Sequence, residues 1–255
     1  MKSLVTGAGR GIGRAIALQL ASDGYDVALH ANASIEAVAE TKSAIEAMGR
    51  KALVVSADFA NLGATRGAVR TIHERWGCLD TVVLSAGLSS GLSLFDITDD
   101  DINLVIDVNL KAPLVLAQET MKAMRDSNVR GNVIIIGSAA GQTGGALVGP
   151  HYVAAKGGTH ALIKSLAKAG APLGIRVNGV APGFVGTGGL DKMKERNGVT
   201  LEELVPIGRI GKVDEIARCV SFLASEAASY IDGALIDVNG GIFMRQGNRM
   251  NAKRR

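Results

Sequence analysis

Cysteine, aromatic residues and long apolar runs are all scarce in this chain of 255 residues. The two cysteines, Cys78 and Cys219, share no motif spacing, so the sequence supports neither a disulfide scaffold nor a metal site. No apolar run approaches the ~20 residues of a membrane span. The apolar stretch at residues 3–7 ends at a glycine turn, short of the ~7–15 apolar residues of a signal peptide. We therefore expect a cytoplasmic protein that binds no metal and no membrane.

Acidic residues are absent from the last eleven positions, residues 245–255, which hold five basic residues. Because the net charge of the whole chain is +4, the remainder carries a charge of about −1. A nucleic-acid partner would need a basic face on the folded body, so we expect none. We interpret residues 245–255 as a basic C-terminal tail on a domain formed by residues 1–244, either solvated or reaching a partner.

Short apolar runs alternate with longer segments of helical spacing along this predicted domain. Runs that are apolar on both faces suit strands buried between two helix layers, and their alternation with helices implies a parallel sheet. The predicted fold is therefore α/β, a single-domain doubly wound parallel sheet with helices on both faces. Ligands of such sheets bind beyond the carboxyl ends of the strands. The predicted strands lie within residues 3–7, 26–31, 52–58, 81–87, 132–138, 175–183 and 234–241.

A glycine-rich turn, Thr6–Gly13 (TGAGRGIG), follows the first predicted strand and opens the first helix. Of its four glycines, those at 7, 11 and 13 form a G-x-x-x-G-x-G spacing, which departs from the commonest dinucleotide spacing, G-x-G-x-x-G. They still let the main chain turn sharply and bring free helix amides close to a pyrophosphate. A plain strand-to-helix turn would also contain glycines, but the position after the first strand favours a dinucleotide site.

No acid ends the second predicted strand, where residues 30–34 read HANAS. Many NAD enzymes place a carboxylate there to bind the adenosine ribose hydroxyls. Arg10 in the glycine turn can instead offer its guanidinium to a 2′-phosphate, although a solvent-exposed role would also explain it. We therefore expect NADP(H) rather than NAD(H). Asp58, at the end of the third strand, either accepts a hydrogen bond from the adenine amino group or caps the next helix.

Tyr152 and Lys156 stand four residues apart in a segment rich in alanine and leucine, so both project from one face of a helix. Such a pair, taken alone, is most often exposed. Two further polar residues change this interpretation, because Ser138 follows an apolar strand and Asn109 interrupts an apolar helix. Together these four side chains predict a catalytic site at the carboxyl edge of the sheet.

With these motifs, the chain resembles the classical branch of the short-chain dehydrogenase/reductase family over about residues 3–242. Within the family, the whole pattern, including residues 206–233, is most similar to the 3-oxoacyl-[acyl-carrier-protein] reductases and their near relatives. The resemblance implies a Rossmann fold, interconversion of a ketone and an alcohol, and a homotetramer. The ordered motifs that carry it are TGAGRGIG, VNL at 108–110, Ser138, YVAAK at 152–156, APG at 181–183 with Thr187, and VNGG at 238–241.

The resemblance implies a role for each member of the catalytic set. Tyr152 would be the general acid for the carbonyl oxygen, and Lys156 would supply a cation that favours the phenolate. Ser138 would orient the carbonyl, and Asn109 would fix a water between Lys156 and solvent. The implied cofactor-binding residues are Gly7, Arg10, Gly11, Ile12, Gly13, Asn32, Ser34, Asp58, Phe59, Ala86, Gly87, Tyr152, Lys156, Pro182, Gly183, Val185 and Thr187.

Two stretches depart from the family pattern. The family usually has Asn-Asn-Ala-Gly after the fourth strand, and residues 84–87 here read Leu-Ser-Ala-Gly, so that only Ser85 could partly replace a missing asparagine. A basic residue that helps to dock an acidic carrier protein is expected near the end of the catalytic helix, where Leu173 stands. Arg125 and Arg130 are the nearby alternatives. The ketone reductase prediction is therefore stronger than the carrier-protein prediction.

The substrate is expected to lie against Leu88, Ser89, the loop at 141–147 and a lid at 184–206. His151 either touches the substrate or packs at the start of the helix. We predict an NADPH-dependent reductase of a ketone, such as a 3-oxoacyl thioester. The alternatives are a secondary-alcohol dehydrogenase acting on a sugar, steroid or specialised metabolite, and an NADP-binding regulator without catalysis. A regulator would have no use for a tuned proton donor.

Overall fold

Strands and helices alternate along the chain as the sequence predicts. The computed structural model describes residues 1–32, 35–145, 147–187 and 200–244, so Ser34, part of the predicted lid and the predicted tail lie outside the described residues. The strands are β1 (Lys2–Thr6), β2 (Asp26–Ala31), β3 (Ala52–Ser56), β4 (Thr81–Leu84), β5 (Asn132–Ile136), β6 (Arg176–Pro182) and β7 (Leu235–Val238). The helices are α1 (Gly11–Ser22), α2 (Ile35–Ala47), α3 (Leu62–Trp76), α4 (Asp99–Ile106), α5 (Ala112–Asp126), α6 (Ala140–Thr143), α7 (Pro150–Gly170) and α9 (Val213–Ala224), with short turns η1 (Asp107–Lys111), η2 (Ala171–Leu173), η3 (Leu201–Leu204) and η4 (Glu226–Ala228).

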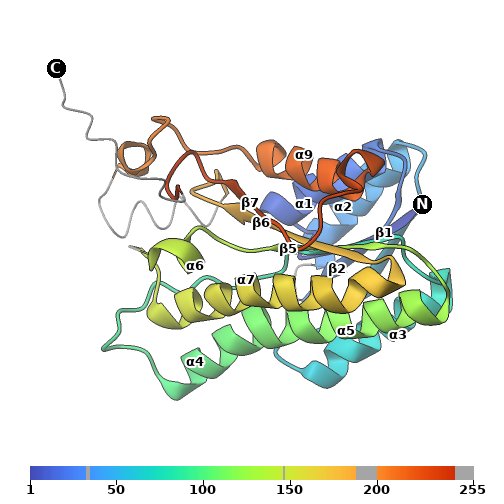
Figure 1. The fold of residues 1–255 in the computed structure, drawn as a ribbon, viewed down its shortest axis with the longest axis horizontal. Coiled ribbons are helices and arrows are strands. Elements are labelled where there is room, and N and C mark those ends of the chain that lie inside the picture. Colours follow the sequence, from blue (N-terminus) through green and yellow to red (C-terminus); the bar gives the residue numbers. More distant parts are fainter. Residues whose placement is uncertain (33–34, 146, 188–199, 245–255) are drawn as a thin grey trace.

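The seven strands form one parallel sheet in the order β3-β2-β1-β4-β5-β6-β7. Helices α1, α2 and α9 cover one face of this sheet, and α3, α5 and α7 cover the other (Figure 1). The strand order reverses between β1 and β4, which is the point where doubly wound sheets bind ligands. The predicted α/β fold is confirmed.

Successive residues of β1 explain why the sheet needs two helix layers. Leu4 belongs to the core that contains Ile72 of α3 and Ile163 of α7. Val5 belongs to the opposite core, which contains Leu20 of α1. Because neighbouring side chains of a strand point to opposite faces, an apolar strand buries hydrocarbon on both sides. Each fully buried side chain of this kind stabilises the fold by roughly 1.5–3 kcal/mol.

A π-helical turn, η1, joins α4 to α5 where the sequence predicted an ordinary helix. The sequence has no local signal for this change, since the residues around Asn109 suit an α-helix equally well. Asn109 is completely buried in the turn. Single π turns within α-helices often occur at functional sites, and this one presents its asparagine toward the loop after β4.

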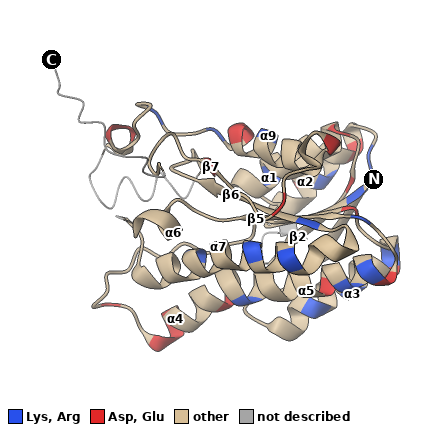
Figure 2. Ribbon diagram, in the orientation of Figure 1, with Lys and Arg blue, Asp and Glu red and all other residues tan. Residues whose placement is uncertain are grey.

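Basic and acidic residues are both distributed along the helices on the two sides of the sheet (Figure 2). Three aspartates, Asp99–Asp101, occupy the first turn of α4, where negative charge interacts favourably with the helix dipole. Over the residues that the structure describes, no helix has both the length and the apolar content needed to cross a bilayer.

Candidate active site

The turn between β1 and α1 folds back closely on itself. A Cβ atom on Gly13 would lie 2.2 Å from the carbonyl oxygen of Gly7, and Gly7 itself has a φ of +68°. Larger residues therefore fit at neither position. Arg10 precedes α1 with an exposed side chain that makes no capping hydrogen bond to the helix amides. A close main-chain turn before uncapped helix amides fits the pyrophosphate of a dinucleotide.

Thr6 links this glycine turn to the turn after β4. Its Oγ1 accepts hydrogen bonds from the main-chain N–H groups of Ser85 and Ala86, both at 2.9 Å. The Cα of Ala86 would lie 3.0 Å from a Cβ atom on Gly7, so the two turns are in contact. The Leu-Ser-Ala-Gly stretch, which differs from the family pattern, is therefore bound through its main-chain N–H groups to the Thr6 hydroxyl.

Asn32 and Asp58 meet beyond the ends of β2 and β3, where Asn32 Nδ2 donates to Asp58 Oδ1 at 3.3 Å. The alternative that Asp58 caps α3 is wrong, because the side chain of Asn61 caps that helix. Phe59 is buried and stacks on His30. His30 was missed as a site residue, although a buried histidine at the end of a strand is itself an unusual position that points to a polar contact.

Lys156 is buried beside Tyr152 on the first two turns of α7. Its Nζ donates to the main-chain carbonyl of Ile136 at 2.9 Å, and only 6% of the residue is exposed. Burial lowers the pKa of Lys156 from 10.5 to about 8, because the ammonium loses hydration. The Nζ atom lies 5.8 Å from the centroid of the Tyr152 ring. The pair is therefore not the exposed pair that a helix surface would present.

Ser138 follows β5 and lines the same cavity as Tyr152. Its Oγ accepts from the main-chain N–H of Ala140 at 3.1 Å, which leaves the hydroxyl proton to be donated. Burial raises the pKa of the Tyr152 phenol, and the nearby Ser138 hydroxyl lowers it in part. The phenol is therefore protonated at neutral pH, as a proton donor must be.

Asn109 uses its side-chain amide to hold the loop after β4. Its Nδ2 donates to the carbonyl of Leu88 at 2.9 Å, and its Oδ1 accepts from the Leu88 N–H at 3.3 Å. Its own carbonyl accepts from the Thr159 hydroxyl of α7 at 3.0 Å. Asn109 Oδ1 and Lys156 Nζ both face Gly87, at 2.9 and 3.6 Å from the position of a Cβ atom there. A water between Asn109 and Lys156 stays a prediction.

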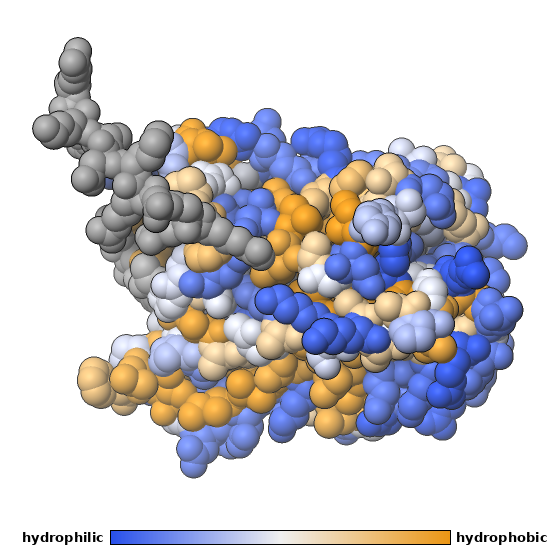
Figure 3. Space-filling view, viewed as in Figure 1, coloured by the Kyte–Doolittle hydropathy of each residue, from blue (hydrophilic) through white to orange (hydrophobic). Residues whose placement is uncertain are grey.

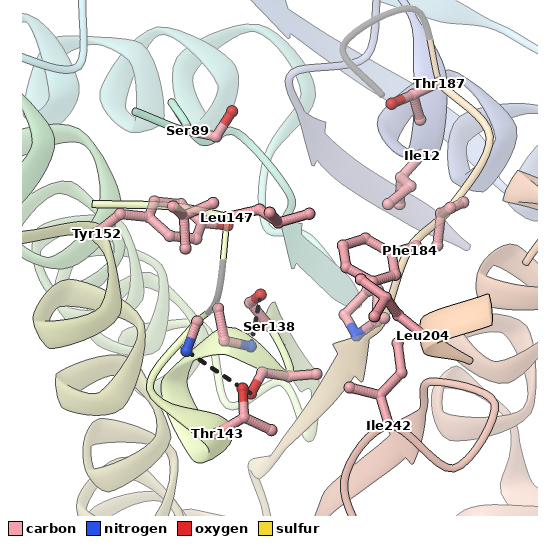
Figure 4. A pocket seen from close by; sticks show the side chains of 17 residues that line it. Ile12, Ser89, Ser138, Thr143, Leu147, Tyr152, Phe184, Thr187, Leu204 and Ile242 are labelled. Carbon is pink, nitrogen blue, oxygen red and sulfur yellow. Dashed lines mark hydrogen bonds between the residues drawn. The ribbon is translucent and has the colours of Figure 1, made fainter. Parts of the chain in front are cut away.

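A cavity of about 460 Å³ opens over Ser138 and Tyr152 (Figure 4). Ile12 and Thr187 mark the end nearest the glycine turn, and Phe184, Leu204 and Ile242 lie across from Tyr152. None of its described lining residues carries a charged side chain. The lining consists of Ile12, Ser89, Ser138, Ala139, Ala140, Thr143, Gly145, Leu147, Val148, Tyr152, Pro182, Gly183, Phe184, Val185, Thr187, Leu204 and Ile242.

Only some of the residues predicted to contact the substrate line this cavity. Ser89, the loop at 141–147 and the described ends of the predicted lid contribute to the lining, whereas Leu88 and His151 do not. His151 is buried, and its ring approaches Gly149, as the packing alternative predicted. Ile242 was missed, because its approach to the cavity depends on the chain folding back after β7 and leaves no local signal in the sequence.

Known proteins are similar to this chain over nearly its whole length. A family model described as enoyl-(acyl carrier protein) reductase matches residues 7–243. The 3-oxoacyl-[acyl-carrier-protein] reductase FabG of Staphylococcus aureus (strain Mu50) is 36% identical over 243 residues, 95% of this chain and 98% of that protein. A short-chain dehydrogenase/reductase of Armillaria gallica is 40% identical, over 94% of this chain and 95% of that protein. The crystal structure of the angucycline C-6 ketoreductase LanV with bound NADP is 33% identical with a TM-score of 0.87, over 94% of this chain and 95% of that chain.

Proposed function

Because this chain belongs to the short-chain dehydrogenase/reductase family of oxidoreductases, we propose that it is an NADPH-dependent reductase that converts a ketone to a secondary alcohol. The observation that carries the proposal is the meeting of Ser138 and Tyr152 at one cavity, with the buried ammonium of Lys156 beside the Tyr152 ring. A protein that only binds NADP has no need for a phenol, a hydroxyl and a buried cation at the same place.

Residues of this chain handle the proton in the proposed reaction. The nicotinamide, when bound, supplies a hydride to the carbonyl carbon. Tyr152 donates its phenolic proton to the carbonyl oxygen, so that negative charge does not accumulate there. The Ser138 hydroxyl donates a hydrogen bond to the same oxygen and orients it. Lys156 stabilises the phenolate that Tyr152 becomes, and its pKa of about 8 allows it to exchange a proton near neutral pH.

Arg10 and Asn32 support NADPH over NADH as the cofactor. The exposed Arg10 stands at the start of α1, where its guanidinium can pair with a 2′-phosphate. Asn32 follows β2 in the place where a carboxylate would repel that phosphate. The glycine turn and the adjacent Ala86 turn would hold the pyrophosphate, and Thr187 would approach the nicotinamide end. The NADP bound to LanV is consistent with this assignment.

The cavity favours a ketone with apolar neighbours over a sugar. Leu147, Val148, Phe184, Leu204 and Ile242 line it with hydrocarbon, and no described lining residue is charged. Each hydroxyl of a polyol that is desolvated here without a partner would cost roughly 1–3 kcal/mol. A 3-oxoacyl thioester or an apolar specialised-metabolite ketone avoids that cost. A sugar dehydrogenase is therefore the less favoured alternative.

A substrate panel tests the proposed function. The purified protein is mixed with NADPH and, in parallel, with acetoacetyl thioester, an aromatic ketone or a ketose, and NADPH absorbance is followed. The reverse reaction is measured with NADP⁺ and a matched set of alcohols and polyols. We expect turnover with the thioester or the aromatic ketone and little with the ketose. Turnover only with ketoses and polyols would reject the proposed substrate class, and no turnover with any compound would reject the reductase.

Arg130 is the basic residue at which an acidic carrier protein would dock. Leu173 is exposed in η2, directly after α7, and the side chain of Arg130 lies beside the adjacent Gly174. Arg125 forms an ion pair with Asp126 instead. If a carrier docks here, Arg130→Ala should raise KM for the carrier-bound 3-oxoacyl substrate and leave KM for a small thioester unchanged. Equal effects on both substrates would reject docking at this position.

Exposed apolar side chains on α4 and the loop before it support a homo-oligomer, proposed as a tetramer (Figure 3). Phe95 is 93% exposed, and Leu94, Ile102 and Leu104 are also exposed. A hydrophobic patch of this kind is typical of an interface. Light scattering on the eluting protein should give four times the monomer mass, and Phe95→Asp should reduce that mass. A monomer in both cases would reject the assembly.

A further inference from the structure

Two main-chain groups at the end of β5, the carbonyl of Ile136 and the N–H of Ser138, have no neighbouring strand, among the residues that the structure describes, with which to form hydrogen bonds. Gly137 and Ala139 donate their N–H groups to carbonyls of Val180 and Pro182, at 2.7 and 2.9 Å. Because successive residues of a strand direct these groups to opposite sides, the carbonyl of Ile136 and the N–H of Ser138 face the β4 side. There β4 has already ended at Leu84, which is paired with Ile135.

Two side chains of α7 take the place of the missing strand. Lys156 Nζ donates to the Ile136 carbonyl at 2.9 Å, and His160 Nε2 accepts from the Ser138 N–H at 3.3 Å. A neighbouring parallel strand would supply the same donor and the same acceptor opposite Gly137. One helical turn separates Lys156 from His160, so the two side chains reach the same strand end.

The main chain around His160 is shaped to hold its ring. A Cβ atom on Gly137 would lie 2.6 Å from His160 Nε2, and one on Gly141 would lie 2.8 Å from its Cε1. No alanine could stand at either position without displacing the ring. The imidazole is therefore in contact with the main chain on both sides of Ser138, which the proposed function places at the reacting carbonyl.

We propose that His160 is a positioning residue, whose unprotonated Nε2 holds the Ser138 main chain and thereby directs the Ser138 hydroxyl toward Tyr152 and the substrate carbonyl. The proposal rests on the proposed ketone reduction. The ring must then be the neutral tautomer that carries its proton on Nδ1. Burial and the charges of Lys156 and Lys164 lower the pKa of His160 to about 4, against the opposing effect of Asp237, and so keep it neutral.

The hydrogen bond itself can be tested without any substrate. Nitrogen NMR shifts of the imidazoles, assigned by comparison with His160→Gln, report which ring nitrogen carries the proton. We expect His160 Nε2 to be unprotonated from about pH 5 to pH 9. A proton on Nε2 in this range would overturn the proposal even if the protein reduces ketones as proposed. Absence of turnover in the wild-type protein would instead count against the proposed function.

Kinetics test the positioning role. His160→Leu removes the acceptor and should lower kcat by ~10–100-fold, the effect of a small misplacement of a reacting group. NADPH affinity should stay within about twofold, because the affected residue orients the ketone. His160→Gln can place a carbonyl oxygen near the position of Nε2 and should recover most of kcat. His73→Leu, which removes an exposed histidine of α3, is the matched control and should change neither value. Equal activity of His160→Leu and the wild type would overturn the proposal.

Alanine substitutions at Gly137 and Gly141 distinguish a positioning role of the His160 ring from a role in filling space. Gly137→Ala should lower the melting temperature, because its Cβ would lie 2.6 Å from His160 Nε2, whereas the next group, the Val180 carbonyl, is at 3.4 Å. Gly137→Ala/His160→Ala should restore the melting temperature but not kcat. In Gly141→Ala the Cβ also meets main-chain atoms of Lys156 and Gly157 at 2.8 Å, so His160→Ala should not rescue it. Recovery of kcat in the Gly137 double variant would overturn the proposal.

Discussion

His30 and Phe59 stack face to face beneath the glycine turn, with ring centroids 3.7 Å apart and planes inclined by 4°. His30 Nδ1 accepts from the Gly7 N–H at 3.4 Å, and its Nε2 lies 2.9 Å from the carbonyl of Ala57. The ring therefore donates from Nε2 and accepts at Nδ1, and burial lowers its pKa so that it stays neutral. One imidazole links the ends of β1, β2 and β3.

We expect His30→Leu to weaken NADPH binding about tenfold, since the hydrogen bond that holds the Gly7 main chain is lost. The dissociation constant can be measured by titrating the fluorescence of NADPH. His73→Leu on the outside of α3 serves as the control. A lower melting temperature with unchanged NADPH affinity would mean that His30 stabilises the fold without shaping the cofactor site.

Arg10→Ala should raise the dissociation constant for NADPH at least ~10-fold and leave that for NADH within about twofold, because only NADPH has the 2′-phosphate. Arg50→Ala is a matched control, since Arg50 pairs with Asp26 at the opposite, amino edge of the sheet. An equal loss of affinity for NADPH and NADH in Arg10→Ala would indicate that Arg10 has a general role in the glycine turn. It would also remove the argument for NADPH as the cofactor.

Tyr152→Phe should lower kcat by ~10²–10⁴-fold, the usual contribution of a general acid, while NADPH still binds. The phenol oxygen is the only group removed, and the ring keeps its packing against Lys156. Tyr230→Phe, which changes a fully exposed phenol, is the control for general effects. Wild-type turnover in Tyr152→Phe would contradict the proposed proton donor and revive the interpretation of the protein as a regulator.

Lys156 should make the stability of the cofactor-free protein rise with pH above about 8. Its folded pKa of about 8 lies below the ordinary lysine pKa of 10.5, so between these values the unfolded chain holds a proton that the folded chain has released. The free energy of unfolding therefore increases with pH over this window and falls as pH drops through 8.

Lys156→Met removes that dependence. The difference in unfolding free energy between Lys156→Met and the wild type, measured by urea denaturation, should favour the variant most at pH 7 and decline by pH 10. Lys164→Met changes an exposed lysine of the same helix and should show no such trend. A difference that grows with pH would contradict the lowered pKa of Lys156.

The spacing of apolar residues along the chain was sufficient to predict that a sheet lies between two layers of helices. The apolar runs around Val5, Leu29 and Ile134 are buried on both faces, as their composition requires. The sequence could not predict η1, whose Asn109 side chain exchanges hydrogen bonds with Leu88, 21 residues earlier in the chain. It also could not assign Asp58, whose helix-cap alternative was excluded only by the position of Asn61.

The sequence by itself determined which chemistry-bearing residues the chain has and the spacing that makes a helix present Tyr152 and Lys156 together, since both follow from local geometry. Only the tertiary structure decided what these residues touch. The bond from the Ser138 N–H to His160 joins residues 22 positions apart, and the bond from Gly7 to His30 joins residues 23 apart. Such contacts depend on where β4 ends and how α7 lies against β5, and no local pattern of the sequence carries that information.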